Sequence, residues 1–181
     1  MRKIAVQVYM SIDGVMEAPE TWSFPYWTDD HEKYAYERLL AADALLLGRS
    51  TYEVFAASWP SRTGDDFSAR MNSLPKYVVS STLGDDDLEW NNSLVIGGDV
   101  VAEVTKLKQQ PGKDILLFGS NQLFNTLLDH HLIDDFRLWV FPLVLGSGRR
   151  LFAGHNEPGK LQLADTTTFS TGVAVLCYQP A

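Results

Sequence analysis

The sequence predicts a three-layer α/β fold in which helices flank a central mixed sheet that is mostly parallel. Strand-like and helix-like stretches alternate over the first two thirds of the 181 residues, which is typical of a parallel sheet. The last third consists of one strand-like stretch after another, which predicts antiparallel edges. Two apolar runs, residues 45–47 and 115–118, break at glycine and continue as helix-like stretches. We expect one domain over residues 1–181, with its ligand crevice at the carboxyl ends of the parallel strands.

The first half of the chain alternates expected strands and helices. Residues 4–10 form an apolar run, which predicts a buried strand that breaks at Ser11-Ile12-Asp13-Gly14. A loop rich in proline and aromatic residues follows, and an aspartate at position 29 or 30 can cap a helix that reaches Ala42. The further expected elements are a strand over 44–47, a helix over 50–57 opened by a capping box at Ser50, an irregular stretch over 58–75 and a strand over 76–80.

The second half supplies two expected helices and the remaining strands. A short strand over 94–96 precedes a helix over 100–108, and the strand over 115–118 precedes a helix over 120–128. The last strands are expected over 136–145, 161–168 and 173–178, with the final two joined as a hairpin.

Composition and charge limit the classes of function. A net charge of −8 argues against a broad surface for nucleic acid or anionic membranes. The single cysteine, Cys177, excludes an internal disulfide and lies in an apolar strand, as expected of a reduced core thiol. No run approaches the ~20 apolar residues of a membrane helix. We therefore expect a cytoplasmic protein with neither a nucleic-acid nor a membrane partner and with no metal site.

Each glycine junction is a candidate phosphate-binding site. A helix N-terminus offers unpaired backbone N–H groups and the positive end of the helix dipole. Glycine at the break lets a phosphate approach the main chain closely. Two such junctions, at Gly48 and Gly119, predict a diphosphate held between two loops, as in a bound dinucleotide. The alternative is that both are ordinary strand-to-helix turns of an α/β protein.

Five segments follow one another along nearly the whole chain. They are Ser11-Ile12-Asp13-Gly14, Leu47-Gly48-Arg49-Ser50-Thr51-Tyr52-Glu53, Val79-Ser80-Ser81-Thr82, Phe118-Gly119-Ser120-Asn121-Gln122-Leu123 and Pro142-Leu143-Val144-Leu145-Gly146-Ser147-Gly148. In this order and spacing they resemble the dihydrofolate reductase-like superfamily. Within it, the chain is most similar to the reductase domain of the bifunctional riboflavin-biosynthesis deaminase-reductase and to free-standing relatives of that domain.

The resemblance implies an NADPH-dependent reductase that transfers a hydride to a C=N or C=O bond of a small heterocyclic substrate. The activity is similar to that of 5-amino-6-(5-phosphoribosylamino)uracil reductase, and a homodimer is implied. Arg49 is the candidate for the 2′-phosphate, because its guanidinium offers paired donors. The implied cofactor-binding residues are Gly48, Arg49, Ser50 and Thr51 at the phosphates, Ser80 and Ser81 at the adenosine ribose, and Phe118, Gly119, Ser120, Gln122 and Leu123 on the other side of the diphosphate.

Two departures from the family pattern concern the substrate. Gln7 stands where the reductase domain commonly carries lysine, and Leu117 stands where it commonly carries glutamate; both positions face the substrate in that family. The zinc-dependent deaminase half is not predicted either, because one cysteine cannot supply its ligands. The identity of the substrate, and whether turnover is retained, therefore stay open.

No motif fixes a catalytic residue. Asp13 belongs to the segment that borders the nicotinamide in the family, while Asp30 and Glu32 lie in the stretch where folate reductases place a carboxylate. Helix capping or a solvated helix face is the alternative for each of them. The alternative functions are a dihydrofolate reductase and a non-catalytic, dimeric nucleotide-binding protein.

Overall fold

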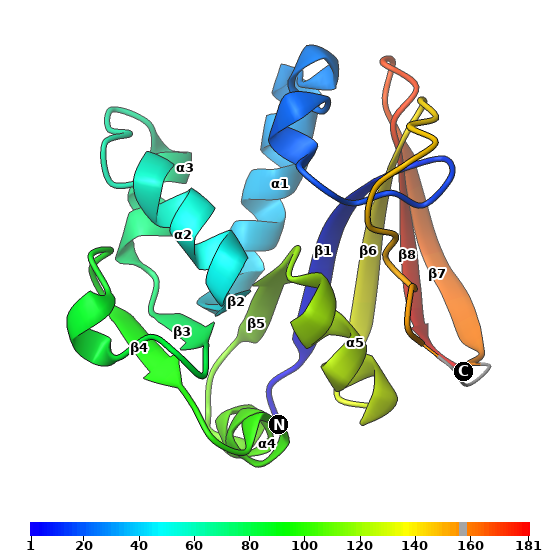
Figure 1. The fold of residues 1–181 in the computed structure, drawn as a ribbon. Coiled ribbons are helices and arrows are strands. Elements are labelled where there is room, and N and C mark those ends of the chain that lie inside the picture. Colours follow the sequence, from blue (N-terminus) through cyan, green and yellow to red (C-terminus); the bar gives the residue numbers. More distant parts are fainter. Residues whose placement is uncertain (156–158) are drawn as a thin grey trace.

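A single eight-stranded sheet runs through the computed structural model, which describes residues 1–155 and 159–181 (Figure 1). Its strand order is β4-β3-β2-β5-β1-β6-β8-β7. The strands from β4 to β6 pair in parallel, and β8 and β7 complete the sheet in antiparallel fashion. The strand bounds are β1 (Ile4–Ser11), β2 (Ala42–Gly48), β3 (Lys76–Val79), β4 (Ser93–Ile96), β5 (Asp114–Phe118), β6 (Asp135–Phe141), β7 (Leu161–Thr168) and β8 (Ala174–Pro180).

Helices cover both faces of the sheet. One face packs against α1 (Asp29–Ala41), α2 (Arg49–Ser58) and α3 (Asp66–Ser73), and the other against α4 (Val100–Gln109) and α5 (Asn121–Asp129). Among the described residues, three single turns of 3₁₀ helix lie in the loops: η1 (Pro19–Thr21), η2 (Phe24–Tyr26) and η3 (Asp85–Asp87). The predicted three-layer arrangement with a mixed, mostly parallel sheet is therefore confirmed.

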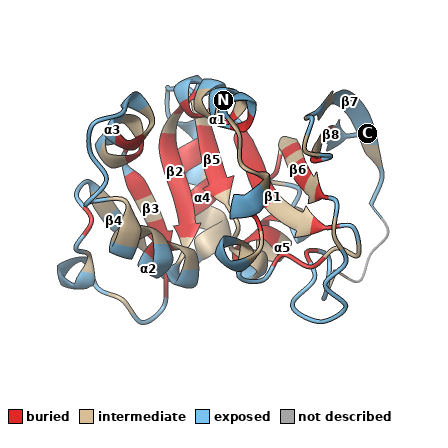
Figure 2. Ribbon diagram, turned by 90° about the horizontal axis from the view of Figure 1, so that it is seen from above, coloured by how far each residue is buried: buried red, intermediate tan, exposed pale blue. Residues whose placement is uncertain are grey.

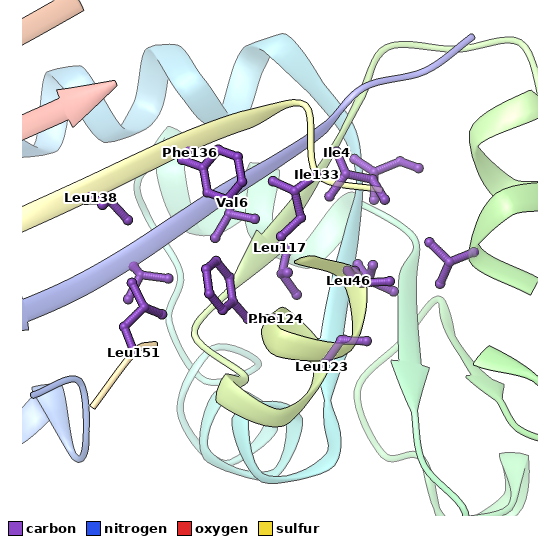
Figure 3. Packing of buried hydrophobic residues seen from close by; sticks show 14 of the residues in the cluster. Ile4, Val6, Leu46, Leu117, Leu123, Phe124, Ile133, Phe136, Leu138 and Leu151 are labelled. Atoms are coloured by element: carbon purple, nitrogen blue, oxygen red, sulfur yellow. The ribbon is translucent and has the colours of Figure 1, made fainter. Parts of the chain in front are cut away.

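The core consists of the two faces of the central strands. On the side of α4 and α5, Val6, Leu46 and Leu117 meet Phe124, whose ring packs edge-on against Phe136 at 6.2 Å between centroids (Figure 3). Residues 45–47 have no exposed surface, because β2 is covered on both faces. Figure 2 shows the same pattern, with buried residues concentrated in the central strands and exposed ones at the periphery.

Three details of the predicted elements are corrected. The stretch over 58–75 is not irregular throughout, because α3 forms within it and is capped by Asp65, which accepts a hydrogen bond from the Ser68 N–H at 2.7 Å. The expected strand over 136–145 ends at Phe141, since Pro142 follows and lacks a backbone N–H. The helix expected from Ser50 begins at Arg49 and has no side-chain cap, so the capping box does not form.

The start of α1 also differs from the expectation that Asp29 or Asp30 caps it. Thr28 is the N-cap, and its backbone N–H donates to Nδ1 of His31 at 3.1 Å. His31 has no exposed surface and packs against Phe169 at 4.1 Å between ring centroids. The cap at Thr28 and the packing of His31 against Phe169 therefore both depend on a neutral imidazole.

This burial predicts a loss of stability in acid. Desolvation lowers the pKa of His31, with the nearby Asp30 opposing the shift, so the unfolded chain binds more protons than the folded one below the ordinary pKa of histidine. The contribution of His31 to the free energy of unfolding is fully present above about pH 7. This contribution falls as the pH drops through ~6.5 towards the lowered pKa. Urea denaturation at about pH 7.5 and about pH 5 measures the change. The wild type is expected to lose more stability than His31→Gln; an equal loss would contradict this account.

Candidate functional site

The two glycine junctions meet at the carboxyl edge of the sheet. Strands β2 and β5 are parallel neighbours, with Leu46 beside Leu117, so the turns that follow them lie together. The Gly48 N–H donates to Ser120 Oγ at 2.8 Å, and the Ser120 hydroxyl lies 3.0 Å from Thr51 Oγ1. The first turns of α2 and α5 are thus joined directly by hydrogen bonds.

Glycine is required at both junctions for different reasons. A Cβ atom at Gly48 would lie 3.2 Å from the side chain of Ser120, which is tighter than most real contacts. Gly119 has a φ of +50°, and a Cβ there would face Thr51 Oγ1 at 3.4 Å. Among the described residues, no side chain caps the first N–H groups of α2 or α5. These donors are therefore available to an anion.

A cleft of about 1540 Å³ opens above these turns. This volume exceeds the roughly 300–1,000 Å³ of an ordinary small-molecule pocket, so the cleft has room for two ligands side by side. Each residue that the sequence predicted for cofactor binding lines it, namely Gly48, Arg49, Ser50, Thr51, Ser80, Ser81, Phe118, Gly119, Ser120, Gln122 and Leu123.

One end of the cleft lies over the β3 and β4 strand ends. Ser80 Oγ accepts the backbone N–H of Thr82 at 3.1 Å and that of Leu83 at 3.0 Å, which fixes the turn after β3. Gly97 and Gly98 line the same end, because β4 is the parallel neighbour of β3. Neither glycine is among the residues predicted from the sequence, although the run from Ile96 to Val100 is a third strand–glycine–helix junction that could have revealed them.

The rest of the cleft has an aromatic lining. Phe24, Trp27, Phe55, Trp59 and Phe67 contribute from the first loop, from α2 and from α3. Trp59 and Phe67 are stacked, with 5.6 Å between their ring centroids. Flat apolar walls of this kind suit planar rings.

Gln7 and Tyr9 line the cleft from β1, at its floor. Gln7 is 3% exposed, and its Oε1 atom has no hydrogen-bond partner among the described residues. Burial raises the pKa of the Tyr9 hydroxyl above its usual range, and a hydrogen bond with the Gln7 side chain opposes this shift. The site therefore contains a buried acceptor that lacks a donor, beside a hydroxyl that keeps its proton. Leu117, by contrast, is fully buried in the core and does not line the cleft.

The three acidic candidates lie in different places. Glu32 lines the cleft. Asp30 instead borders a small depression with Tyr34 and Phe169. Asp13 does not line the cleft either, since its carboxylate accepts hydrogen bonds from the Ser11 hydroxyl at 2.6 Å and from the backbone N–H groups of Leu145 and Gly146 at 3.1 and 2.9 Å.

These hydrogen bonds, led by that from Ser11, lower the pKa of Asp13 to about 2, so it is ionised at neutral pH and ties the loop after β6 to the loop after β1. We predict that Asp13→Ala accelerates hydrogen exchange at the Leu145 and Gly146 amides by about tenfold. Asp30→Ala is the matched control and should leave both amides unchanged. Equal protection in the wild type and Asp13→Ala would show that the carboxylate does not hold the loop.

The described part of the chain shows neither a metal-binding cluster nor a membrane-spanning helix. Within residues 1–155 and 159–181, no group of three or more His, Cys, Asp or Glu side chains is arranged to hold a metal ion. None of the helices in the same ranges is long and apolar enough to cross a membrane. Cys177 is buried as predicted, but its Sγ contacts a polar group, Nη1 of Arg137 at 3.3 Å.

Comparison with known proteins assigns the family. The sequence model of the RibD C-terminal domain family matches residues 2–175. The chain belongs to this family. The uncharacterised protein YyaP of Bacillus subtilis (strain 168) is 31% identical to this RibD C-terminal domain over 181 residues, which cover 98% of the chain and 94% of YyaP.

Solved structures show that this RibD C-terminal domain has the dihydrofolate reductase-like fold. A Shewanella sp. PV-4 protein provisionally assigned to riboflavin biosynthesis has a TM-score of 0.80 at 18% identity, with 100% of this chain and 99% of that one covered. The Thermotoga maritima diaminohydroxyphosphoribosylaminopyrimidine deaminase/5-amino-6-(5-phosphoribosylamino)uracil reductase has a TM-score of 0.70 at 17% identity, covering 99% of this chain and 57% of that one. Enterococcus faecalis dihydrofolate reductase has a TM-score of 0.66 at 14% identity, covering 98% of this chain and 96% of that one. The predicted resemblance and fold are confirmed.

Proposed function

We propose that this protein is an NADPH-dependent reductase that transfers a hydride to a C=N or C=O bond of a small heterocyclic molecule. The activity is of the same type as 5-amino-6-(5-phosphoribosylamino)uracil reduction. The observation that carries the proposal is the convergence of two helix N-termini, each preceded by glycine and free of side-chain caps, on one cleft. Membership of the RibD C-terminal domain family supports it.

The residues present fit NADPH. The first N–H groups of α2 and α5 would hold the diphosphate, because Gly48 and Gly119 leave the main chain open to it. Ser81 and Thr82 would contact the adenosine half at the β3 end of the cleft, where Arg49 also lies. NADPH supplies the hydride from its nicotinamide ring. Gln7, whose buried Oε1 lacks a donor among the described residues, would accept an N–H from either the carboxamide or the substrate.

The chain's own contribution is to orient the ligands, exclude water and deliver a proton. The aromatic lining would stack on the planar substrate and keep water away from the reacting bond. Hydride reduction of a C=N or C=O bond also needs a proton. Of the three acidic candidates we propose Glu32, because Asp13 is held in the loop contact and Asp30 lies outside the cleft.

Titration of the intrinsic tryptophan fluorescence with NADPH tests the proposal, since Trp27 and Trp59 line the cleft. We expect saturable quenching with a micromolar dissociation constant, followed by NADPH oxidation with one member of a panel of phosphoribosylaminopyrimidines, pterins and aldehydes. Absence of NADPH binding would overturn the proposal. Binding without turnover across the panel would favour a non-catalytic nucleotide-binding protein, and competitive inhibition by a diaminopyrimidine antifolate would favour folate reduction.

Glu32→Gln is expected to lower the rate of NADPH oxidation by about 100-fold without changing the dissociation constant of NADPH. The removed group would supply the proton and would not touch the cofactor. Glu37→Gln, on the same helix but outside the cleft, is the matched control and should retain full activity. Steady-state kinetics on the substrate identified by the panel measures both variants, and an unimpaired Glu32→Gln enzyme would exclude this role.

The family resemblance also supports a homodimer that acts in the cytoplasm. Light scattering coupled to size-exclusion chromatography tests the oligomer, for which a mass of twice 20.3 kDa is expected.

A further inference from the structure

Arg49 is engaged by two partners at the adenosine end of the cleft. Its Nε donates to Glu53 Oε1 at 2.7 Å, one helical turn further along α2. Its Nη1 donates to Thr82 Oγ1 at 2.6 Å, in the turn after β3. The guanidinium thus spans the space between α2 and that turn, with two of its five N–H donors in use.

Among the described residues, Arg49 supplies the positive charge at this end of the cleft. The other basic side chains lining the cleft are Arg62, whose guanidinium lies 4.6 Å from the centroid of the Trp59 ring, and Arg149, which is 3.8 Å from a Glu17 carboxylate oxygen. Three carboxylates, those of residues 85–87, follow Thr82 within five positions. The charge available to attract a phosphate here therefore depends on one arginine.

Glu53 neutralises that arginine. The pair is half exposed, with 50% and 49% of the two side chains accessible. Arg49 can therefore exchange Glu53 for a ligand without leaving either charge buried. A 2′-phosphate would have to compete with the Glu53 carboxylate for the guanidinium. A free 2′-hydroxyl does not need that charge. Glu53 itself does not line the cleft, so it acts through Arg49, which does.

We propose that Glu53 sets the choice between NADPH and NADH by occupying Arg49. The inference rests on the proposed function, because it assumes that a nicotinamide dinucleotide lies in the cleft. It implies that Glu53 lowers the preference of the wild-type protein for NADPH over NADH. Glu53 is thus a specificity-determining residue, and Arg49 is the group through which it acts.

Dissociation constants for NADPH and NADH, measured by fluorescence at one fixed ionic strength, test the proposal. In the wild type we expect the two constants to agree within about tenfold. Glu53→Gln should raise the ratio of the NADH constant to the NADPH constant by about tenfold, because it frees a charged donor for the 2′-phosphate. Arg49→Gln should bring the ratio close to one, and adding Glu53→Gln to it should have no further effect.

Glu103→Gln is the matched control for the change in net charge. Glu103 forms a comparable exposed pair with Lys106 on α4, at 2.7 Å. Lys106, unlike Arg49, does not line the cleft, so the ratio for Glu103→Gln should equal that of the wild type. If both cofactors bind and Glu53→Gln leaves the ratio unchanged, the inference is overturned and the proposed reductase stands. If neither cofactor binds, both are overturned.

Discussion

Replacing Gly119 with valine is expected to weaken NADPH binding by at least ~100-fold, equivalent to about 2.7 kcal/mol. Residue 119 has a φ of +50°, and its missing Cβ faces Thr51 across the gap between the two helix N-termini. A branched side chain at this position would fill the approach to the backbone N–H groups of α5. Fluorescence titration with NADPH measures the loss.

Gly154→Val separates this effect from backbone strain. Gly154 has a φ of +97°, so valine there is at least as strained. A Cβ atom at Gly154 would meet none of the described residues within 4 Å, and Gly154 does not line the cleft. Gly154→Val should bind NADPH like the wild type. Normal binding by a folded Gly119→Val protein would contradict the proposed position of the diphosphate.

Trp139→Ala is expected to destabilise the protein by about 3–5 kcal/mol. The ring is fully buried and packs against Tyr9, Tyr34 and Phe169 at centroid distances of 5.3–5.6 Å. Its removal leaves a large void beneath the strand that supplies the floor of the cleft. Urea denaturation followed by circular dichroism measures the free energy of unfolding, so the probe does not depend on the deleted indole.

Trp139→Phe is the comparison for this variant. Phenylalanine keeps a ring in the cluster, and the indole Nε1 that it removes has no hydrogen-bond partner among the described residues. We expect the free energy of unfolding of Trp139→Phe to fall by less than about 2 kcal/mol. The variant should bind NADPH normally, because Trp139 does not line the cleft. If the free energy of unfolding of Trp139→Ala lies within about 1 kcal/mol of the wild-type value, the stabilising role assigned to Trp139 is refuted.

The part of the cleft around the two glycine junctions could be predicted because it follows from local sequence. Gly48 and Gly119 each end an apolar strand and precede a helix, and parallel strands bring such ends to one edge of the sheet. The eleven residues that the family resemblance implied line one cleft for this reason, while their contact with NADPH stays a prediction. The same pattern occurs at Gly97 and was missed, because β4 is short and Gly98 is followed by a polar cap, Asp99.

The acidic candidates could not be separated by sequence. Asp13 is held by the backbone of residues 145 and 146, more than 130 positions away, and no local pattern reveals such a contact. Asp30 and Glu32 are two positions apart on α1, and only the rotation of the helix against the sheet puts Glu32 in the cleft. Helix α3 was missed because its amphipathic pattern is short and follows a polar loop. These features depend on tertiary packing.

A crystal structure of the protein with bound NADPH tests the central claim most directly. We predict that the diphosphate oxygens accept hydrogen bonds from first-turn N–H groups of both α2 and α5, with the adenosine directed towards Ser81 and Thr82. A diphosphate bound elsewhere, or held by only one of the two helices, would contradict the claim that the paired glycine junctions form the cofactor site.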